Sequence, residues 1–330
     1  MAKRKLSIQQ KNRIQAIQDK RRNRKISVDE NTLGAKEEGL IIAHHGTNLT
    51  VEKSDGENIR CHYRQNLGSI VTGDKVIWQP QETTDFGIIS AVLPRRSLLS
   101  RPVKLSHQNK DVAANIDQII IVIAVEPEPV EHYIDRYLVA AEHQHIKPIL
   151  LLNKIDLLSE EKHTHFETLI RRYESLGYQV ISLSAFDLKN DSALQPLLDD
   201  KTSIFVGQSG VGKSEIIHSL LPDIKIRIGD ISASNKRGRH TTTTATLYHL
   251  PHGGILIDSP GIREFGLWDL PQEAIFDGFI DFKQLKGQCK FRNCNHTDGT
   301  PGCAILEAVK NNQIDLQRFK NYHRILCELD

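Results

Sequence analysis

Two kinds of hydrophobic pattern divide the chain. Between residues 39 and 93, short apolar or β-branched runs are separated by Gly, Asn, Asp or Pro. This pattern predicts five short strands, over residues 39–46, 48–53, 58–64, 74–80 and 87–94. Five short strands suit a small barrel of the OB type, which often binds oligonucleotides but can also serve packing alone.

From residue 117 onwards, continuous apolar runs alternate with amphipathic stretches. The pattern predicts strands over residues 117–125, 148–156, 178–185 and 202–210, the second and last of them running into loops, and helices over 131–144, 160–177 and 213–221. Such alternation is typical of a parallel sheet covered on both faces. Two more strands are expected over 244–250, an antiparallel candidate, and 253–261. We expect residues 93–102 to form a basic linker, and the tail from Pro271 to form helices around a cluster of Cys and His residues.

The composition, 39% hydrophobic and 25% charged in 330 residues, is that of an ordinary globular protein. The longest apolar run, Ile119–Val125, is too short to span a bilayer, and no apolar segment follows the basic N-terminus. We therefore expect no secretory signal and a cytoplasmic location.

The net charge of +2 conceals an uneven distribution. Residues 1–25 contain ten Lys or Arg and one Asp, which gives +9 and leaves −7 for the rest of the chain. A basic arm on an acidic body favours an anionic polymer as partner, although a solvated tail that aids solubility would have the same composition.

A phosphate-binding loop is the first candidate site. Gly207, Gly212, Lys213 and Ser214 match the P-loop pattern G-x-x-x-x-G-K-S, between an expected strand and an expected helix. In this arrangement the backbone N–H groups and the helix N-terminus bind phosphate oxygens. Lys213 reaches the β- and γ-phosphates, and the Ser214 hydroxyl binds Mg²⁺.

The sequence NKID, residues 153–156, indicates which base the P-loop serves. Asp156 can accept two hydrogen bonds from the N1–H and 2-amino groups of guanine, and adenine has no such pair of donors. Asn153 can hold the loop, and the aliphatic stem of Lys154 can cover the ring face. The backbone N–H of Ala185, in the sequence SLSAF, can reach the guanine 6-oxo group.

Two more polar loops complete the predicted nucleotide site. Asp258 of DSPG can hold Mg²⁺ through water, and Gly261 can sense the γ-phosphate. One of Thr241 to Thr243, in GRHTTTT, can add a hydroxyl to the ion. The complete set of predicted nucleotide and Mg²⁺ residues is Asn153, Lys154, Ile155, Asp156, Ser184, Ala185, Gly207, Gln208, Ser209, Gly210, Val211, Gly212, Lys213, Ser214, Glu215, Thr241, Thr242, Asp258 and Gly261.

The group that orients the attacking water is less evident. Many GTPases have a glutamine directly after the glycine of the DxxG motif, and this chain has Ile262 there, so we expect slow intrinsic turnover. His240 is the local candidate for the role, beside Lys213 as the second catalytic residue. The alternative for His240 is a loop or RNA-contact residue.

A cluster of Cys and His residues predicts a metal centre. Cys289, Cys294, His296 and Cys303 offer three thiolates and one imidazole, which is a ligand set of structural zinc. Four such ligands leave no open coordination position, so we expect a structural role.

In this order, the motifs NKxD, SxA, GxxxxGKS, GRHTTT and DSPG resemble those of the circularly permuted GTPases. The barrel before them and the Cys/His cluster after them narrow the resemblance to the small-ribosomal-subunit-dependent GTPases, the bacterial GTPase A family, over nearly all of residues 36–330. The resemblance implies hydrolysis of GTP to GDP and phosphate, stimulated by the small ribosomal subunit, in late maturation of that subunit. It also implies zinc at the four Cys and His positions.

We therefore expect an α/β fold, with a circularly permuted P-loop GTPase domain between an N-terminal OB-like β-barrel and a C-terminal helical zinc-binding domain. The expected units are a basic flexible arm over residues 1–35, the barrel over 36–100, the GTPase domain over 101–268 and the zinc-binding domain over 269–330. Because the chain passes from DSPG directly into the last unit, we hypothesise that nucleotide state repositions that unit.

The expected cofactors are one structural Zn²⁺ and Mg²⁺ with GTP. The expected partners are the small ribosomal subunit with its rRNA, and GTP or GDP, with no membrane; the chain is expected to be a monomer. The alternative function is a nucleotide-regulated RNA-binding scaffold with little intrinsic catalysis.

Overall fold

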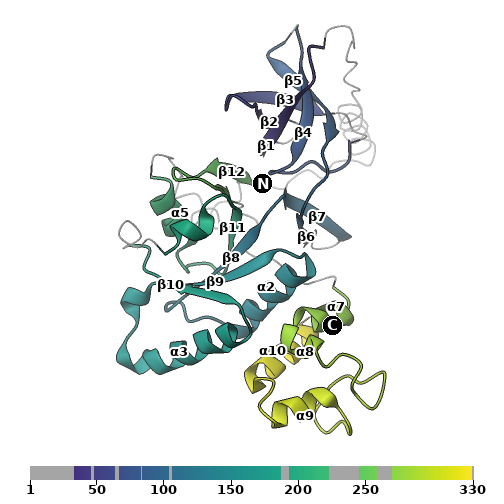
Figure 1. Cartoon of the computed structure of the whole chain (residues 1–330), viewed down its shortest axis with the longest axis vertical. Coiled ribbons are helices and arrows are strands. Elements are labelled where there is room, and N and C mark those ends of the chain that lie inside the picture. The colour runs from purple at the N-terminus through teal and green to yellow at the C-terminus, as the bar shows by residue number, and fades with distance from the viewer. Residues whose placement is uncertain are drawn as a thin grey trace, which may run out of the picture.

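The computed structural model describes residues 33–45, 48–63, 67–82, 84–103, 106–186, 193–222, 245–258 and 270–328. A barrel, a sheet with helices and a helical C-terminal unit follow one another along the longest axis of the molecule (Figure 1). None of the helices in the described part of the chain combines the length and the apolarity that crossing a bilayer requires.

The N-terminal part is a closed barrel. Its five strands are β1 (Glu37–His45), β2 (Asn48–Glu52), β3 (Asn58–Tyr63), β4 (Lys75–Pro80) and β5 (Phe86–Val92). β1 pairs with both β2 and β4, and β3 pairs in parallel with β5, so the strands close into a ring. Ile41, Val51 and Trp78 are buried in its interior, as alternation along half-buried strands requires. The expected OB-like barrel is confirmed.

A hairpin that the sequence did not predict follows the barrel. β6 (Leu98–Val103) pairs antiparallel with β7 (Ser106–Ala114), so the prediction of a linker over residues 93–102 is wrong. Arg95 in this segment donates to both carboxylate oxygens of the fully buried Asp74, at 2.7 and 2.8 Å. Arg95 thus neutralises a buried carboxylate, which requires a partner. The hairpin also crosses the boundary expected at residue 100, and the domain limits remain a prediction.

The central part is the expected mostly parallel sheet. Its strands are β8 (Gln118–Ala124), β9 (Lys147–Asn153), β10 (Gln179–Ser182), β11 (Thr202–Val206), β12 (Thr246–His249) and β13 (Ile255–Asp258). The spatial order is β10-β9-β8-β11-β13-β12, with only β12 antiparallel to its neighbour β13. β11 and β13, which come late in the chain, therefore lie beside β8, the first strand of this sheet in the sequence, and complete the sheet. β12 also pairs with β1, so the sheet continues into the barrel.

Helices cover both faces of this sheet. They are α2 (Glu131–His143), α3 (Glu160–Ser175), the short α4 (Gln195–Leu198) and α5 (Lys213–Leu220). Ile119 and Ile121 of β8 belong to the apolar cluster of α2 and α3, whereas Ile120 and Val122 belong to that of α5. Successive residues of a strand point to opposite faces, so a continuously apolar strand is buried on both.

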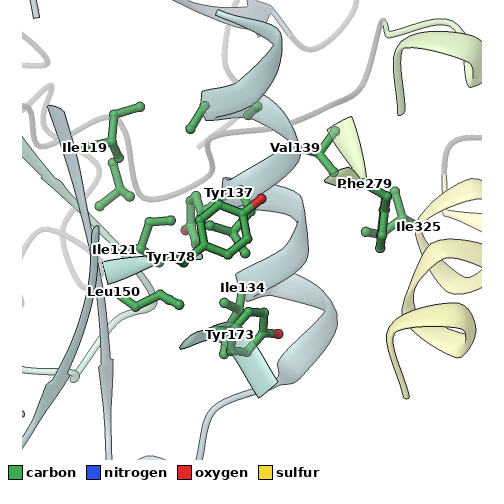
Figure 2. Packing of buried hydrophobic residues seen from close by; sticks show 14 of the residues in the cluster. Ile119, Ile121, Ile134, Tyr137, Val139, Leu150, Tyr173, Tyr178, Phe279 and Ile325 are labelled. Atoms are coloured by element: carbon green, nitrogen blue, oxygen red, sulfur yellow. The ribbon is translucent and has the colours of Figure 1, made fainter. Parts of the chain in front are cut away.

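The C-terminal unit packs on the outer side of α2. It contains α7 (Gln272–Gly278), α8 (Ile280–Lys283), α9 (Ala304–Lys310) and α10 (Leu316–Cys327). Figure 2 shows α2 between the sheet residues Ile121 and Leu150 on one side and Phe279 and Ile325 on the other. A Cβ on Gly278 would lie 2.6 Å from a methyl group of Val139, so glycine permits this close approach of α7 to α2.

Candidate nucleotide site and metal centre

The P-loop connects the end of β11 to the start of α5. Gly207, Gly210 and Gly212 have positive φ angles of 139°, 85° and 95°. A Cβ on Gly207 would lie 2.2 Å from the carbonyl oxygen of Val122. One on Gly212 would lie 2.1 Å from Nδ2 of Asn153. Both glycines of the motif are therefore required by the backbone conformation and by the available space.

Lys213 is the first residue of α5, so the P-loop leads directly into a helix N-terminus, whose first backbone N–H groups lack partners within the helix and suit phosphate oxygens. The Lys213 ammonium donates to the carbonyl oxygens of Gly207 and Gln208. Ser214 and the exposed Glu215 follow on the first turn of α5. The arrangement holds a cation against the loop that the motif assigns to phosphate.

Asn153 joins three segments that are far apart in the sequence. It ends β9 and is fully buried. Its Nδ2 donates to the carbonyl oxygen of Val211 in the P-loop at 2.9 Å, and its Oδ1 accepts from the N–H of Ala185 at 3.0 Å. The predicted base-reading loop, the SxA segment (SLSAF, residues 182–186) and the P-loop thus meet at one amide group.

Lys154 adds a second connection. Its φ of 61° is a left-handed conformation that costs a non-glycine residue about 1–2 kcal/mol. Its Nζ donates to the carbonyl oxygens of Gly210 and Glu126, both at 2.7 Å, and these two bonds offset the strain. Ile155 then opens a one-turn 3₁₀ helix in which Asp156 is exposed to solvent.

The SxA segment is held from three directions. In addition to the Asn153 bond, the Ser219 hydroxyl on α5 donates to the carbonyl oxygen of Ala185 at 3.3 Å. The N–H of Ile155 donates to the carbonyl oxygen of Leu183 at 3.4 Å. The Ser184 hydroxyl is buried without a hydrogen-bond partner among the described residues, which costs about 1–3 kcal/mol unless a ligand group meets it.

The candidate Mg²⁺ residues come from neighbouring elements. Asp258 ends β13, which pairs in parallel with β11, so it leaves the sheet at the same edge as the P-loop. Ser214 stands at the start of α5 on that edge. The predicted residues His240, Thr241, Thr242 and Gly261, as well as Ile262, lie outside the described residues.

Two contributors to this site were not found from the sequence. The Glu126 carbonyl that receives Lys154 lies in the loop between β8 and α2, and Ser219 lies beyond the P-loop motif. A backbone carbonyl has no side-chain signature, so the sequence offers no signal for the first. Ser219 lies six residues after Lys213 on α5, and only the expected course of that helix could have suggested it.

The four predicted zinc ligands form one cluster. Sγ of Cys289 lies 3.7 Å from Nδ1 of His296 and 4.0 Å from Sγ of Cys303. Nδ1 of His296 lies 3.4 Å from Sγ of Cys303, and the ligand atoms of all four residues, Cys294 included, lie within 4.8 Å of one another. Tetrahedral zinc with bonds of about 2.0–2.3 Å separates its ligand atoms by about 3.4–3.8 Å, so the separations of 3.4, 3.7 and 4.0 Å are close to those that this ion requires.

The surroundings of the cluster also suit a cation. The N–H of Ala304 donates to Sγ of Cys289 at 3.4 Å, and that of Leu306 donates to Sγ of Cys303 at 3.5 Å. Burial raises the pKa of Cys303 to about 11, a rise that a bound divalent ion would reverse. Burial lowers the pKa of His296, which keeps its imidazole in the neutral form that binds metal.

Comparison with known proteins places this geometry in a family. The model of the RsgA GTPase family matches residues 92–268. The chain is 47% identical over 337 aligned residues to the small ribosomal subunit biogenesis GTPase RsgA of Pseudomonas aeruginosa strain LESB58, covering 100% of this chain and 98% of that protein. It is 48% identical to the protein of the same name from Hahella chejuensis, over 98% and 96% of the two chains.

Solved structures agree. The crystal structure of YjeQ from Thermotoga maritima is 33% identical and superposes with a TM-score of 0.72 over 89% of this chain and 99% of its own. The structure of YloQ, described as a circularly permuted GTPase, is 27% identical with a TM-score of 0.68 over 89% and 95% of the two chains. The order of the strands, the motifs on their carboxyl ends and these similarities lead to one conclusion: the chain belongs to the RsgA GTPase family.

Proposed function

We propose that this protein hydrolyses GTP to GDP and phosphate, that the small ribosomal subunit stimulates the reaction, and that it acts in late maturation of that subunit by binding its rRNA. Family membership and the names of the relatives support the reaction and the process. The single observation that carries the proposal is the Asn153 junction, because its two hydrogen bonds join the predicted base-reading and phosphate-binding segments, which are reversed along the chain.

In the proposed site, the P-loop N–H groups and Lys213 hold the phosphates. Ser214 and Asp258 hold Mg²⁺, which neutralises charge on the phosphate oxygens. Asp156 selects guanine by accepting hydrogen bonds from its N1–H and 2-amino groups, and the Ala185 N–H is the candidate contact to the 6-oxo group. Thr241, Thr242 and Gly261 are expected to complete the γ-phosphate end.

Slow intrinsic turnover follows from Ile262, which cannot orient water. His240 remains the candidate group for that step, with RNA contact as its alternative. Either another group of the chain, such as His240, or the ribosomal subunit must complete the site, and stimulation by the subunit is the expected signature of the protein.

The remaining proposals concern cofactors and partners. One Zn²⁺ on the Cys₃His cluster orders the loop from residue 289 to 303. We expect a monomer in the cytoplasm that contacts rRNA through the barrel, the segment 236–239 and the basic arm.

The test is the rate of GTP hydrolysis by the full chain alone, with small subunits and with large subunits. We expect acceleration by small subunits only, and a loss of at least about 100-fold in the stimulated rate for Lys213→Ala. Tight GTP binding without stimulation would instead support the nucleotide-regulated RNA-binding scaffold.

The basic arm has its own test. Deleting residues 1–25 removes ten cations, so small-subunit affinity should fall and its dependence on salt should become shallower, by about 0.7–0.9 in log–log slope for each phosphate that the arm no longer neutralises. A full-length variant with residues 1–25 in scrambled order is the matched control, because it keeps the charge. Unchanged affinity after the deletion would exclude a binding role for the arm.

A further inference from the structure

A second pocket lies at the edge of the central sheet opposite the candidate nucleotide site. Its volume is about 460 Å³, and it is lined by the first residues of β9 and β10 and by residues at the C-terminal ends of α2 and α3. β9 begins here at Lys147 and ends at Asn153, so the two sites are about 20 Å apart. Small-molecule sites typically have volumes of about 300–1,000 Å³, so this pocket has room for a ligand of its own.

Two of the residues that line this pocket carry carboxylates in unfavourable places. Glu142 belongs to the last turn of α2, and Glu174 belongs to the last turn of α3. The C-terminus of a helix carries partial negative charge, so an acidic side chain there is destabilising. Neither carboxylate forms an ion pair with another residue in the described part of the chain. Residues that oppose a local preference without compensation are expected at binding sites.

The balance of charge at the pocket is negative. Among the described residues that line it, the only cation is Lys147, and its exposed ammonium donates to Oε1 of Gln179 at 3.2 Å instead of pairing with a glutamate. An anionic ligand would meet two carboxylates and the negative ends of two helices. The pocket therefore favours a ligand with positive charge.

The wall of the pocket contains a polar group that has no partner. Tyr178 is 7% exposed, and its hydroxyl makes no hydrogen bond within the described ranges. Burial, followed by the negative charge of Glu142, raises the pKa of Tyr178, so its phenol is neutral and can accept a hydrogen bond. Most buried polar atoms in proteins are hydrogen-bonded, and an ammonium group beside Glu142 would supply the donor that this oxygen lacks.

We propose that this pocket binds an alkyl diamine or polyamine, whose ammonium groups pair with Glu142 and Glu174 and whose methylene chain packs on the half-buried Leu176 and Ile280. Ile280 is the first residue of α8, whereas the other three belong to the GTPase part. The ligand thus contacts both parts of the molecule and stabilises the docking of the C-terminal unit by binding only the docked form. This site is separate from the function proposed above and does not depend on it.

The experiment measures dissociation constants for 1,4-diaminobutane and for butylamine by calorimetry at fixed ionic strength. The full chain is used without nucleotide, because polyamines also bind phosphates. The diamine should bind at least about tenfold more tightly than the monoamine, since it makes a second charge-assisted contact. Glu142→Gln and Glu174→Gln should each weaken diamine binding about tenfold or more, to the level of butylamine. Tyr178→Phe should weaken it about 2- to 10-fold.

Glu161→Gln is the matched control, because it removes an exposed carboxylate from the first turn of the same helix, α3. Its affinity for the diamine should equal that of the original protein. The diamine should also raise the melting temperature of the original protein and of Glu161→Gln, and leave that of the Glu142→Gln, Glu174→Gln double variant unchanged. Circular dichroism checks that each variant is folded.

The outcomes separate a specific site from general attraction to an acidic protein. Equal losses in Glu161→Gln and Glu174→Gln, or displacement of the diamine by Mg²⁺ at the same ionic strength, would assign the binding to a diffuse ion atmosphere and overturn the proposal. Equal affinities for diamine and monoamine would rule out pairing with both carboxylates. Absence of diamine binding to the original protein would end the proposal and leave the GTPase function untouched.

Discussion

Asn153 makes two buried hydrogen bonds through one amide group, so its replacement tests at the residue scale whether three loops form one site. Asn153→Ala leaves the Val211 carbonyl and the Ala185 N–H without that partner, at a cost of about 1–3 kcal/mol for each buried group. We expect the melting temperature to fall and GDP affinity to drop by about tenfold or more, measured by calorimetry.

The control for this change is Asn58→Ala, which removes an exposed amide at the start of β3. Equal behaviour of the two variants would show that the junction is not needed for nucleotide binding.

The sequence predicted that Asn153 holds its loop, because an NKxD motif after an apolar strand has that role. It did not reveal which carbonyls receive Lys154, since backbone acceptors depend on the path of the chain and not on residue type.

At the scale of elements, a buried ion cluster connects the C-terminal helices to the GTPase part. Arg318 of α10 is 1% exposed and pairs with Asp135 of α2 and Asp281 of α8. Asp135 also accepts from Tyr173 of α3 at 3.1 Å and from Asn321 of α10 at 2.6 Å. Four helices therefore share one network.

Replacing the cation should be strongly destabilising. Arg318→Met leaves two buried carboxylates without their cation, so we expect the free energy of unfolding to fall by about 3–5 kcal/mol in urea denaturation. The matched control is Arg171→Met, which breaks an exposed pair with Glu167 on α3 and should cost less than about 1 kcal/mol. Similar losses in the two variants would mean that the buried cluster does not stabilise the fold.

The predicted metal centre also acts at the scale of elements, because its four ligands lie in the loop between α8 and α9 and at the start of α9. We expect one zinc per chain by elemental analysis, absent from Cys294→Ser and retained in Cys327→Ser, whose cysteine is exposed and outside the cluster. Loss of zinc should speed hydrogen exchange at the Lys290 N–H, which is bonded to the Gly302 carbonyl at 2.9 Å. A zinc-free protein with full protection at this amide would contradict a structural role.

The strands and helices with strong apolar periodicity were predictable, and the β6–β7 hairpin was not. β7 reads SHQNKDVAA, with one β-branched residue, so neither alternation nor β-propensity marks it as a strand. Its pairing with β6 is a tertiary effect that overrides weak local preference. The Cys₃His cluster was predictable because ligand spacing is visible in the sequence itself.

At the scale of the whole molecule, the three parts are joined by contacts between residues far apart in the chain. The Thr72 hydroxyl of the barrel part donates to the Ala245 carbonyl at 2.8 Å, and Ala43 of β1 pairs with Thr246 of β12. Asn115 donates to the Gly73 carbonyl, at the junction of hairpin and barrel. A single sequence contains no signal for such pairings, which is why the barrel and the sheet were predicted but their continuity was not.

The contacts between parts of the molecule also bear on the hypothesis that nucleotide state repositions the C-terminal unit. The unit follows Asp258 and the predicted γ-phosphate end along the chain, but it is docked on α2. Coupling free energies between sites are typically about 1–3 kcal/mol, whereas undocking would expose Phe279 and Ile325, and burial of such a side chain contributes about 1.5–3 kcal/mol each. Docking should therefore prevail in the free protein.

We accordingly expect the same radius of gyration by small-angle scattering for the free protein with GDP and with a non-hydrolysable GTP analogue. Arg318→Met removes the restraint, so its two nucleotide states should differ, provided that circular dichroism shows the variant folded. A difference already present in the original protein would mean that the γ-phosphate outweighs the buried ion cluster. Binding to the ribosomal subunit can supply the free energy needed to undock the C-terminal unit from α2. We therefore expect repositioning only in the bound protein. Labels on the C-terminal helices, compared between the GDP and GTP-analogue states of the bound protein, would detect it.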